Sequence, residues 1–269
     1  MNLRLLRQTL SARRSTLLIV VLSAVGWGAL VPVFYTSFSE LMADLIAAGM
    51  PPIIENLMNF GSGSFFTLPG ALTIGLQHPM AIALIAVFAT GAGATVIAGQ
   101  RERGTLEVLL ARPLSRHSLY LSMAGALLLA TAAVLAALLV GQLIGSTLLD
   151  IVDEIDGALM PLVWLNGLLL WATFLSFALA MSVSFDRAGP AIGLSLAFLI
   201  VNYFLEILGS LWTDVEWTQE YSLFHHFQPS EILTGKADLT DLLILGVAAL
   251  VPAVYAWIVF PRRDLAAPA

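Results

Sequence analysis

Six long apolar runs constrain the fold of this sequence more than any other feature. They cover residues 17–36, 79–99, 119–149, 161–184, 189–211 and 242–260. Each is long enough to cross a bilayer as a helix, which takes about 20 mainly apolar residues. Only 11% of the residues are charged, whereas a water-soluble domain carries about a quarter. The sequence therefore predicts an all-α integral membrane protein with six transmembrane helices, which form one domain over residues 1–269.

The charged residues are divided between alternate connections. Eleven of the twelve basic residues lie at the termini or in the connections after the second and fourth runs. They are Arg4, Arg7, Arg13, Arg14, Arg101, Arg103, Arg112, Arg116, Arg187, Arg262 and Arg263. Most acidic residues lie in the other connections. Because loops rich in lysine and arginine stay in the cytoplasm, we expect a multi-pass protein of the cytoplasmic membrane with both termini in the cytoplasm.

The segment before the first run has arginines beside an apolar side. Leu3, Leu6 and Leu10 share one side of a helix over residues 2–14. This pattern favours an interfacial helix lying on the membrane, with a solvated positive flank as the alternative. No small-residue cleavage site follows the run before Phe38, so the segment does not resemble a cleaved signal peptide.

The connection Gly99–Arg116 is charged but has a regular pattern. Four apolar residues fall at helical spacing, namely Leu106, Leu109, Leu110 and Pro113. The spacing predicts a short amphipathic helix, on whose polar side Arg103 and Glu107 can pair. Ser115 is placed to cap the helix of the third run. A short amphipathic helix between two membrane helices suits docking against another protein.

The region 212–241 is dense in aromatic residues. They are Trp212, Trp217, Tyr221, Phe224 and Phe227. Such residues gather at the lipid–water boundary, so we expect short helices that turn back toward the bilayer. His225 and His226 could be interpreted as metal ligands, but adjacent histidines point to different sides of a helix and do not readily share one ion.

Glu206 is the one acidic residue within an apolar run, and Asn202 lies one turn before it. Ionisable groups inside membranes are functional candidates. Glu206 is also near the outer end of its run, where a side chain can reach water. The sequence leaves open whether Asn202 and Glu206 are functional or Glu206 simply extends to the surface.

The chain lacks the means to hydrolyse ATP. A phosphate-binding loop ends in Gly-Lys-Ser/Thr, but the one lysine, Lys236, is followed by Ala237. There is no cysteine and no His-Glu-x-x-His motif. We therefore expect no catalytic, cofactor or metal site in this chain.

The charged connection resembles the loop between spans 2 and 3 of ABC type-2 exporter permeases. The shared pattern is Gly99-x-x-Glu102-x-Gly104-Thr105-Leu106-Glu107-x-Leu109-Leu110-x-x-Pro113-x-Ser115-Arg116, with a departure at Gln100, where many relatives have glutamate. In that family this segment is the coupling helix, which sits in a groove of the ATPase subunit. The resemblance implies that the ATPase-coupling residues are Arg101, Glu102, Arg103, Gly104, Thr105, Leu106, Glu107, Leu109 and Leu110, with a second contact at Asp186 and Arg187. It also implies an N-terminal interfacial elbow and paired re-entrant helices over 212–241.

The resemblance implies a permease subunit that exports a substrate with energy from ATP hydrolysed by a separate ATPase. ATP and Mg²⁺ would bind that partner, and a second permease copy or a sister permease would complete the assembly within membrane lipid, with no nucleic acid involved. A membrane-embedded enzyme and a membrane assembly factor are the alternatives. A few polar residues within the runs favour an amphipathic or apolar cargo. They are Thr131, Gln142, Asn166, Ser176 and Asn202.

Overall fold

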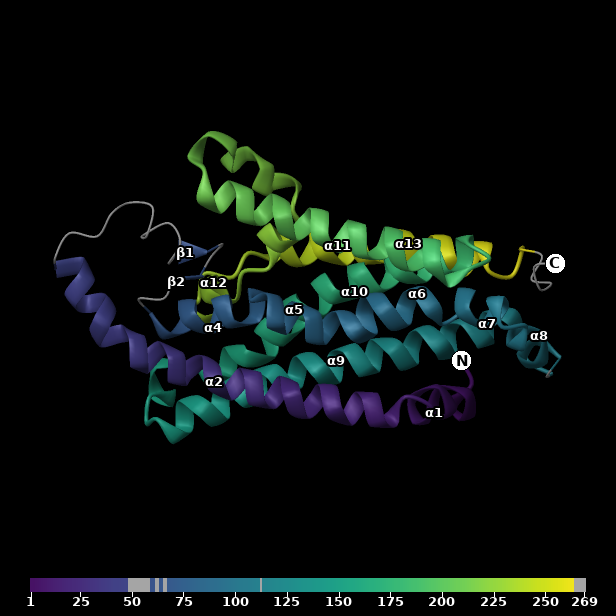
Figure 1. Cartoon of the computed structure of the whole chain (residues 1–269), viewed down its shortest axis with the longest axis horizontal. Coiled ribbons are helices and arrows are strands. Elements are labelled where there is room, and N and C mark those ends of the chain that lie inside the picture. Colours follow the sequence, from purple (N-terminus) through teal and green to yellow (C-terminus); the bar gives the residue numbers. More distant parts are fainter. Residues whose placement is uncertain (48–58, 61–62, 65–66, 112, 264–269) are drawn as a thin grey trace.

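The structure, a computed structural model, describes residues 1–47, 59–60, 63–64, 67–111 and 113–263. Its long helices lie side by side along the length of the molecule (Figure 1). They are α2 (Arg14–Ala47), α9 (Arg116–Leu148), α10 (Met160–Ser184), α11 (Ala188–Leu211) and α13 (Leu239–Val259). Each contains a stretch that is long and apolar enough to cross a membrane. The predicted helical membrane architecture is confirmed.

The predicted second crossing is a broken helix. Its parts are α4 (Leu68–Gln77), α5 (Pro79–Ala86), the π-helical turn η1 (Val87–Ala92) and α6 (Gly93–Thr95). The segments Leu68–Gln77 and Pro79–Thr95 meet at an angle of 49° and make a sixth crossing if they are counted as one span. Pro79 begins α5, as predicted for a proline in the first turn of a helix. The sequence prediction began the crossing there and missed α4.

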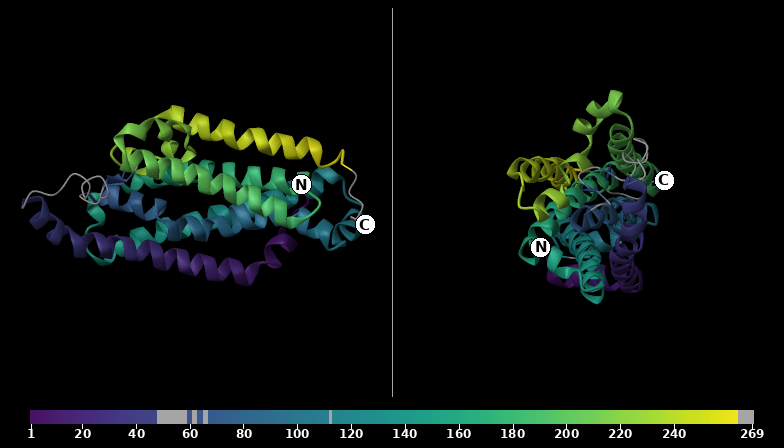
Figure 2. Two further views of the ribbon diagram at one scale, coloured as in Figure 1. Left: turned by 45° about the horizontal axis from the view of Figure 1, so that its top comes forward. Right: turned by 90° about the vertical axis from the view of Figure 1, so that its left-hand side faces the viewer.

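Short elements occupy the two ends of the bundle. At one end, α1 (Leu3–Ser11), α7 (Ala98–Glu102) and α8 (Thr105–Leu110) lie near the end of α13 (Figure 1). The N-terminus is at this same end in Figure 1 and in the left-hand view of Figure 2. The predicted helix at the N-terminus is therefore present as α1, and it packs on α9 through the buried Leu5 and Leu6.

The opposite end holds the remaining short elements. They are the paired strands β1 (Asn59–Phe60) and β2 (Gly63–Ser64), and the helical turns η2 (Val152–Glu154), η3 (Gly157–Leu159), η4 (Thr213–Tyr221), η5 (Leu223–His226) and α12 (Pro229–Leu233). The short helices predicted over 212–241 are thus present, mostly as 3-10 turns. η4 packs back against α11, where the Thr218 hydroxyl donates to the Leu205 carbonyl at 3.1 Å. Their immersion in lipid stays a prediction.

α2 and α9 pack with their backbones in unusually close approach. A Cβ atom at Gly28 would lie 2.2 Å from the Leu138 carbonyl oxygen, and one at Gly141 would lie 2.2 Å from the Val25 carbonyl oxygen. Any larger side chain at either position would therefore force the two helices apart. Small residues allow this kind of contact between membrane helices, whose association depends on close van der Waals packing rather than on burial from water.

Candidate functional site

The predicted coupling helix is α8, which follows α7 after a sharp turn. Gly104 stands between them with a φ of 68°, in the left-handed region where glycine is favoured. The Thr105 hydroxyl lies 3.2 Å from the Gln100 carbonyl oxygen and 3.1 Å from Oε1 of the same residue. These contacts hold the first residue of α8 against α7, so the two short helices form one structured unit.

The apolar stripe of α8 faces the chain itself. Leu106 is completely buried in the main core, and Leu109 and Leu110 are half-buried against it. Glu107 and Val108 point the other way, and Val108 is 65% exposed. The amphipathic pattern predicted a helix that docks on another protein, whereas the leucines of its stripe attach α8 to the membrane bundle. The surface of α8 left for a partner is the opposite side.

Asp186, on the connection between α10 and α11, links three parts of the chain. Its Oδ1 lies 2.8 Å from Arg101 Nη1 and 2.6 Å from Arg263 Nη2. We call Arg101, Asp186 and Arg263 the charged clasp. Beside it, Glu102 Oε2 accepts a hydrogen bond of 3.0 Å from the backbone N–H of Ala188 at the start of α11. The two segments predicted as separate ATPase contacts are therefore joined to each other.

The clasp includes one residue that sequence reasoning missed as a site. Arg263 also donates to the Val183 carbonyl, while Arg116 Nη1 donates to the backbone carbonyls of Pro261 and Arg263 at 3.2 and 2.9 Å. Arg101 is almost buried, whereas the Asp186 side chain is 46% exposed. Arg103, Thr105 and Arg187 are exposed on the same end of the bundle. No sequence motif pointed to Arg263 beyond its position at the basic flank of the last run.

Glu206 and Asn202 lie toward the other end, on α11. Glu206 is 1% exposed, and its Oε1 accepts a hydrogen bond of 3.2 Å from Gln219 Nε2 on η4. The side chain is therefore covered by protein, and the alternative that it extends to water is wrong. Asn202 Oδ1 accepts from the Leu223 N–H at 3.0 Å, and its carbonyl accepts from the Ser222 hydroxyl at 3.0 Å. We call η4, η5 and the residues up to Gln228 the returning segment. Asn202 thus attaches the returning segment to α11.

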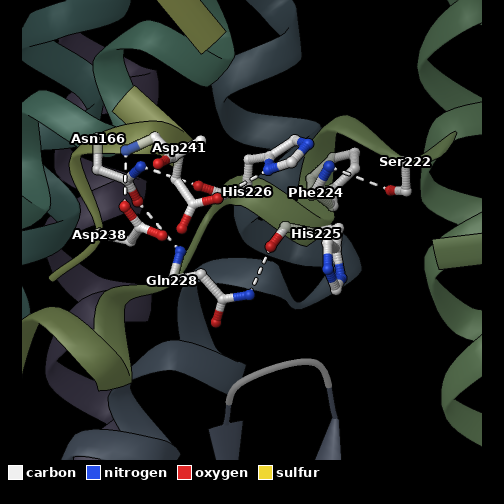
Figure 3. A network of polar contacts seen from close by, with 9 residues as sticks. Asn166, Ser222, Phe224, His225, His226, Gln228, Asp238 and Asp241 are labelled. Carbon is white, nitrogen blue, oxygen red and sulfur yellow. Dashed lines mark hydrogen bonds and ion pairs between the residues drawn. The ribbon is translucent and has the colours of Figure 1, made fainter. Parts of the chain in front are cut away.

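A second amide supports the same segment from α10 (Figure 3). Asn166 Nδ2 donates to the His226 carbonyl at 3.0 Å, and its Oδ1 accepts from the Gln228 N–H at 3.1 Å. His226 Nδ1 lies 2.8 Å from Asp241 Oδ1 in the first turn of α13. In the part of the chain that the structure describes, no three histidine or acidic side chains are grouped as metal ligands. The metal-dependent enzyme alternative therefore gains no support from His225 and His226.

A match over nearly the whole chain decides the family to which it belongs. Residues 7–265 match the model of a family described as "ABC-2 family transporter protein". The chain belongs to the ABC-2 transporter family. No curated protein and no solved structure gives a significant match to it. The match covers α2 to α13 together with the connection Gly99–Arg116, so the resemblance drawn from that connection is confirmed. The ABC-2 protein is a multi-pass membrane component of an ABC transporter.

Several polar residues inside the spans of this ABC-2 protein have internal partners. Gln142 Nε2 donates to the Leu72 carbonyl of α4 at 2.8 Å. Where the broken second crossing ends, the Ser182 hydroxyl accepts from the N–H groups of Ile97 and Ala98 at 3.1 and 3.0 Å. Backbone groups freed at helix breaks need such partners away from water. Gln142 and Ser182 therefore serve the fold, and the amphipathic or apolar nature of the cargo stays a prediction.

Proposed function

We propose that this chain is the membrane-spanning subunit of an ABC exporter in the cytoplasmic membrane. A separate ATPase subunit binds ATP and Mg²⁺ and supplies the energy, and a second copy or a sister permease completes the transporter. The observation that carries the proposal is the joined surface at one end of the bundle, where the charged clasp and the Glu102–Ala188 hydrogen bond tie α7, and α8 with it, to the Asp186–Arg187 connection. The basic character of this end supports its placement in the cytoplasm.

The attachment of α8 suits the transmission of motion from an ATPase. Leu106 fixes α8 to the core, and α7 continues from the broken second crossing. Through the clasp, the same unit is tied to the connection between α10 and α11 and to the chain after α13. A displacement of α8 therefore acts on several spans at once, because Leu106 and the charged clasp join the unit of α7 and α8 to the bundle.

Two surfaces within the spans are available to a substrate or to a second permease. A groove of about 690 Å³ lies between α10, α11 and α13, with mostly apolar walls that include Phe177, Phe198 and Val251. On α11, Ile200 and Phe204 are exposed large apolar side chains. These features support an apolar pathway or a contact between permeases, in keeping with the dimeric assembly of the proposal.

The test is to express the chain with the ABC ATPase encoded beside it and to purify the complex. We expect the two chains to purify together, and inverted membrane vesicles to accumulate labelled compounds from a panel of lipids and amphipathic molecules when ATP is added. An ATPase whose phosphate-loop lysine is replaced by alanine is the control. Co-purification without ATP-dependent accumulation for any compound would favour an assembly factor, and accumulation on the opposite side would contradict export.

A further inference from the structure

A separate pocket lies between the N-terminal helix α1 and the pair of short helices α7 and α8, which we call the coupling unit. It has a volume of about 460 Å³ and is lined by residues of α1, of the α1–α2 junction, of α7 and α8, and of α9. Leu5, Val96 and Met123 give it a buried apolar floor. Polar groups surround its opening, where Arg13, Gln100 and Arg103 contribute side chains. The pocket is thus built by segments far apart in the sequence.

Two arginines share this pocket without an acidic residue among its described lining. Arg13 is half-buried and Arg103 is exposed. Burial, followed by the positive charge of Arg103, lowers the pKa of the Arg13 guanidinium, although an arginine stays protonated in proteins. Among the described arginines, Arg101 and Arg263 are instead the ones that pair with Asp186. The two cations therefore repel each other unless an anion lies between them.

We propose that this pocket binds the phosphate group of an acidic phospholipid from the cytoplasmic leaflet. The planar guanidinium groups of Arg13 and Arg103 match the geometry of phosphate oxygens. Gln100 offers a further donor, because its Oε1 is occupied by the Thr105 hydroxyl while its amide N–H groups remain for the ligand. The buried apolar floor suits the glycerol and the first carbons of the acyl chains.

The pocket lies where a lipid headgroup would be found. α2 begins at Arg14, next to the pocket, and its following turns expose Leu18, Ile19 and Leu22, each by more than half. Large exposed apolar side chains at the start of a membrane helix are in contact with lipid, so the arginines before them lie at headgroup depth. The inference rests on the proposed orientation of the chain, but it does not depend on transport.

The bound lipid would connect the N-terminal helix to the coupling unit. Arg103 follows the last residue of α7 and precedes the turn at Gly104 that leads into α8. Its guanidinium lies over Gly99, where a Cβ atom would be 3.4 Å from Arg103 Nη1. A phosphate held by both Arg13 and Arg103 therefore bridges α1 and α7 and makes the position of α8 sensitive to the lipid composition of the membrane.

The experiment measures lipid retention by the full-length protein. Protein exchanged from mixed micelles of phosphatidylcholine and phosphatidylglycerol is examined by native mass spectrometry. We expect preferential retention of phosphatidylglycerol, and about a fivefold loss of its apparent affinity for each of Arg13→Gln and Arg103→Gln. Arg4→Gln and Arg7→Gln, at exposed positions of α1 outside the pocket, are matched controls and should retain the lipid.

Further measurements separate the possible sources of the anion. Inorganic phosphate at millimolar concentration should not displace phosphatidylglycerol, and displacement would identify a soluble phosphate site instead. Unchanged lipid retention in Arg13→Gln together with loss of the ATPase partner would overturn the proposal in favour of a protein contact. Thermal unfolding in phosphatidylcholine alone checks folding of each variant. Should Arg13→Gln fail to fold, the exposed Arg103→Gln decides the matter, because equal retention by that variant contradicts the proposal.

Discussion

Substitutions at Leu106 and Val108, on opposite sides of α8, should separate its attachment to the bundle from its contact with a partner. Leu106 is completely buried, so Leu106→Ala removes core contacts and leaves a cavity. Truncation of a buried leucine to alanine costs 2–5 kcal/mol, and we expect about 3 kcal/mol here. Val108 is 65% exposed, so Val108→Asp should change the stability of the permease by no more than about 0.5 kcal/mol.

For binding of the ATPase partner, we expect Val108→Asp to have a larger effect than Leu106→Ala. If the exposed side of α8 enters a dry groove of the ATPase, Val108→Asp places a charge there and costs about 3 kcal/mol of binding. This is a loss of more than about 100-fold in affinity. Leu106→Ala should weaken binding only through the lowered population of folded α8. Val108→Ala, which removes no charge and adds none, is the matched control and should retain the partner.

The assay combines thermal unfolding of purified permease with titration of the ATPase subunit. Each variant is first adjusted to the same amount of correctly inserted protein. The expected pattern is a lowered melting temperature with partner retention for Leu106→Ala, and an unchanged melting temperature with partner loss for Val108→Asp. The reasoning is refuted if Val108→Asp binds the ATPase as tightly as the original chain, because the exposed side of α8 would then not be the docking surface.

Three further predictions concern orientation, the clasp and the returning segment. The chain has no native cysteine, so a single introduced cysteine is the one site that an impermeant maleimide can label. Ser115→Cys should react only from the cytoplasm and Asp153→Cys only from outside. Labelling of both from one side would contradict the predicted topology. Asp186→Asn should cost at most about 1 kcal/mol of stability because the Asp186 side chain is 46% exposed. The same variant should lower the ratio of substrate moved to ATP hydrolysed, and an unchanged ratio would exclude a role of the clasp in coupling. Asn166→Ala leaves two backbone groups without partners and should lower stability by about 1–3 kcal/mol in thermal unfolding, whereas an unchanged melting temperature would show that water replaces these bonds.

Long uninterrupted runs were predictable because apolar length alone identifies a membrane helix. α9 begins where Ser115 caps it, through a hydrogen bond of 3.2 Å from the Ser118 N–H, as its sequence position indicated. α4 was missed because Gly70 and Gly75 are poor helix formers and the break at His78 divides the crossing. Its stability comes from tertiary contacts that a local pattern does not contain.

The candidate site was predictable in position but not in orientation. Helical spacing showed that Leu106 and Leu109 share a face, but it did not show whether that face meets the same chain or another one. Asn166 and Asn202 were likewise visible as polar residues in apolar runs. Their partners at His226 and Leu223 lie 60 and 21 residues away, and only the folded chain brings them together.

The close contact between α2 and α9 determines which parts of the molecule can move during transport. With the two backbones in close contact at Gly28 and Gly141, sliding of one helix along the other would place carbonyl groups against larger neighbouring side chains, and separation would lose the close van der Waals packing. We therefore expect α2 and α9 to move together as one body. We then expect a change of access from one side of the membrane to the other to occur elsewhere, and the 49° bend beside His78 and the π-helical turn Val87–Ala92 are the candidate hinges within the broken second crossing.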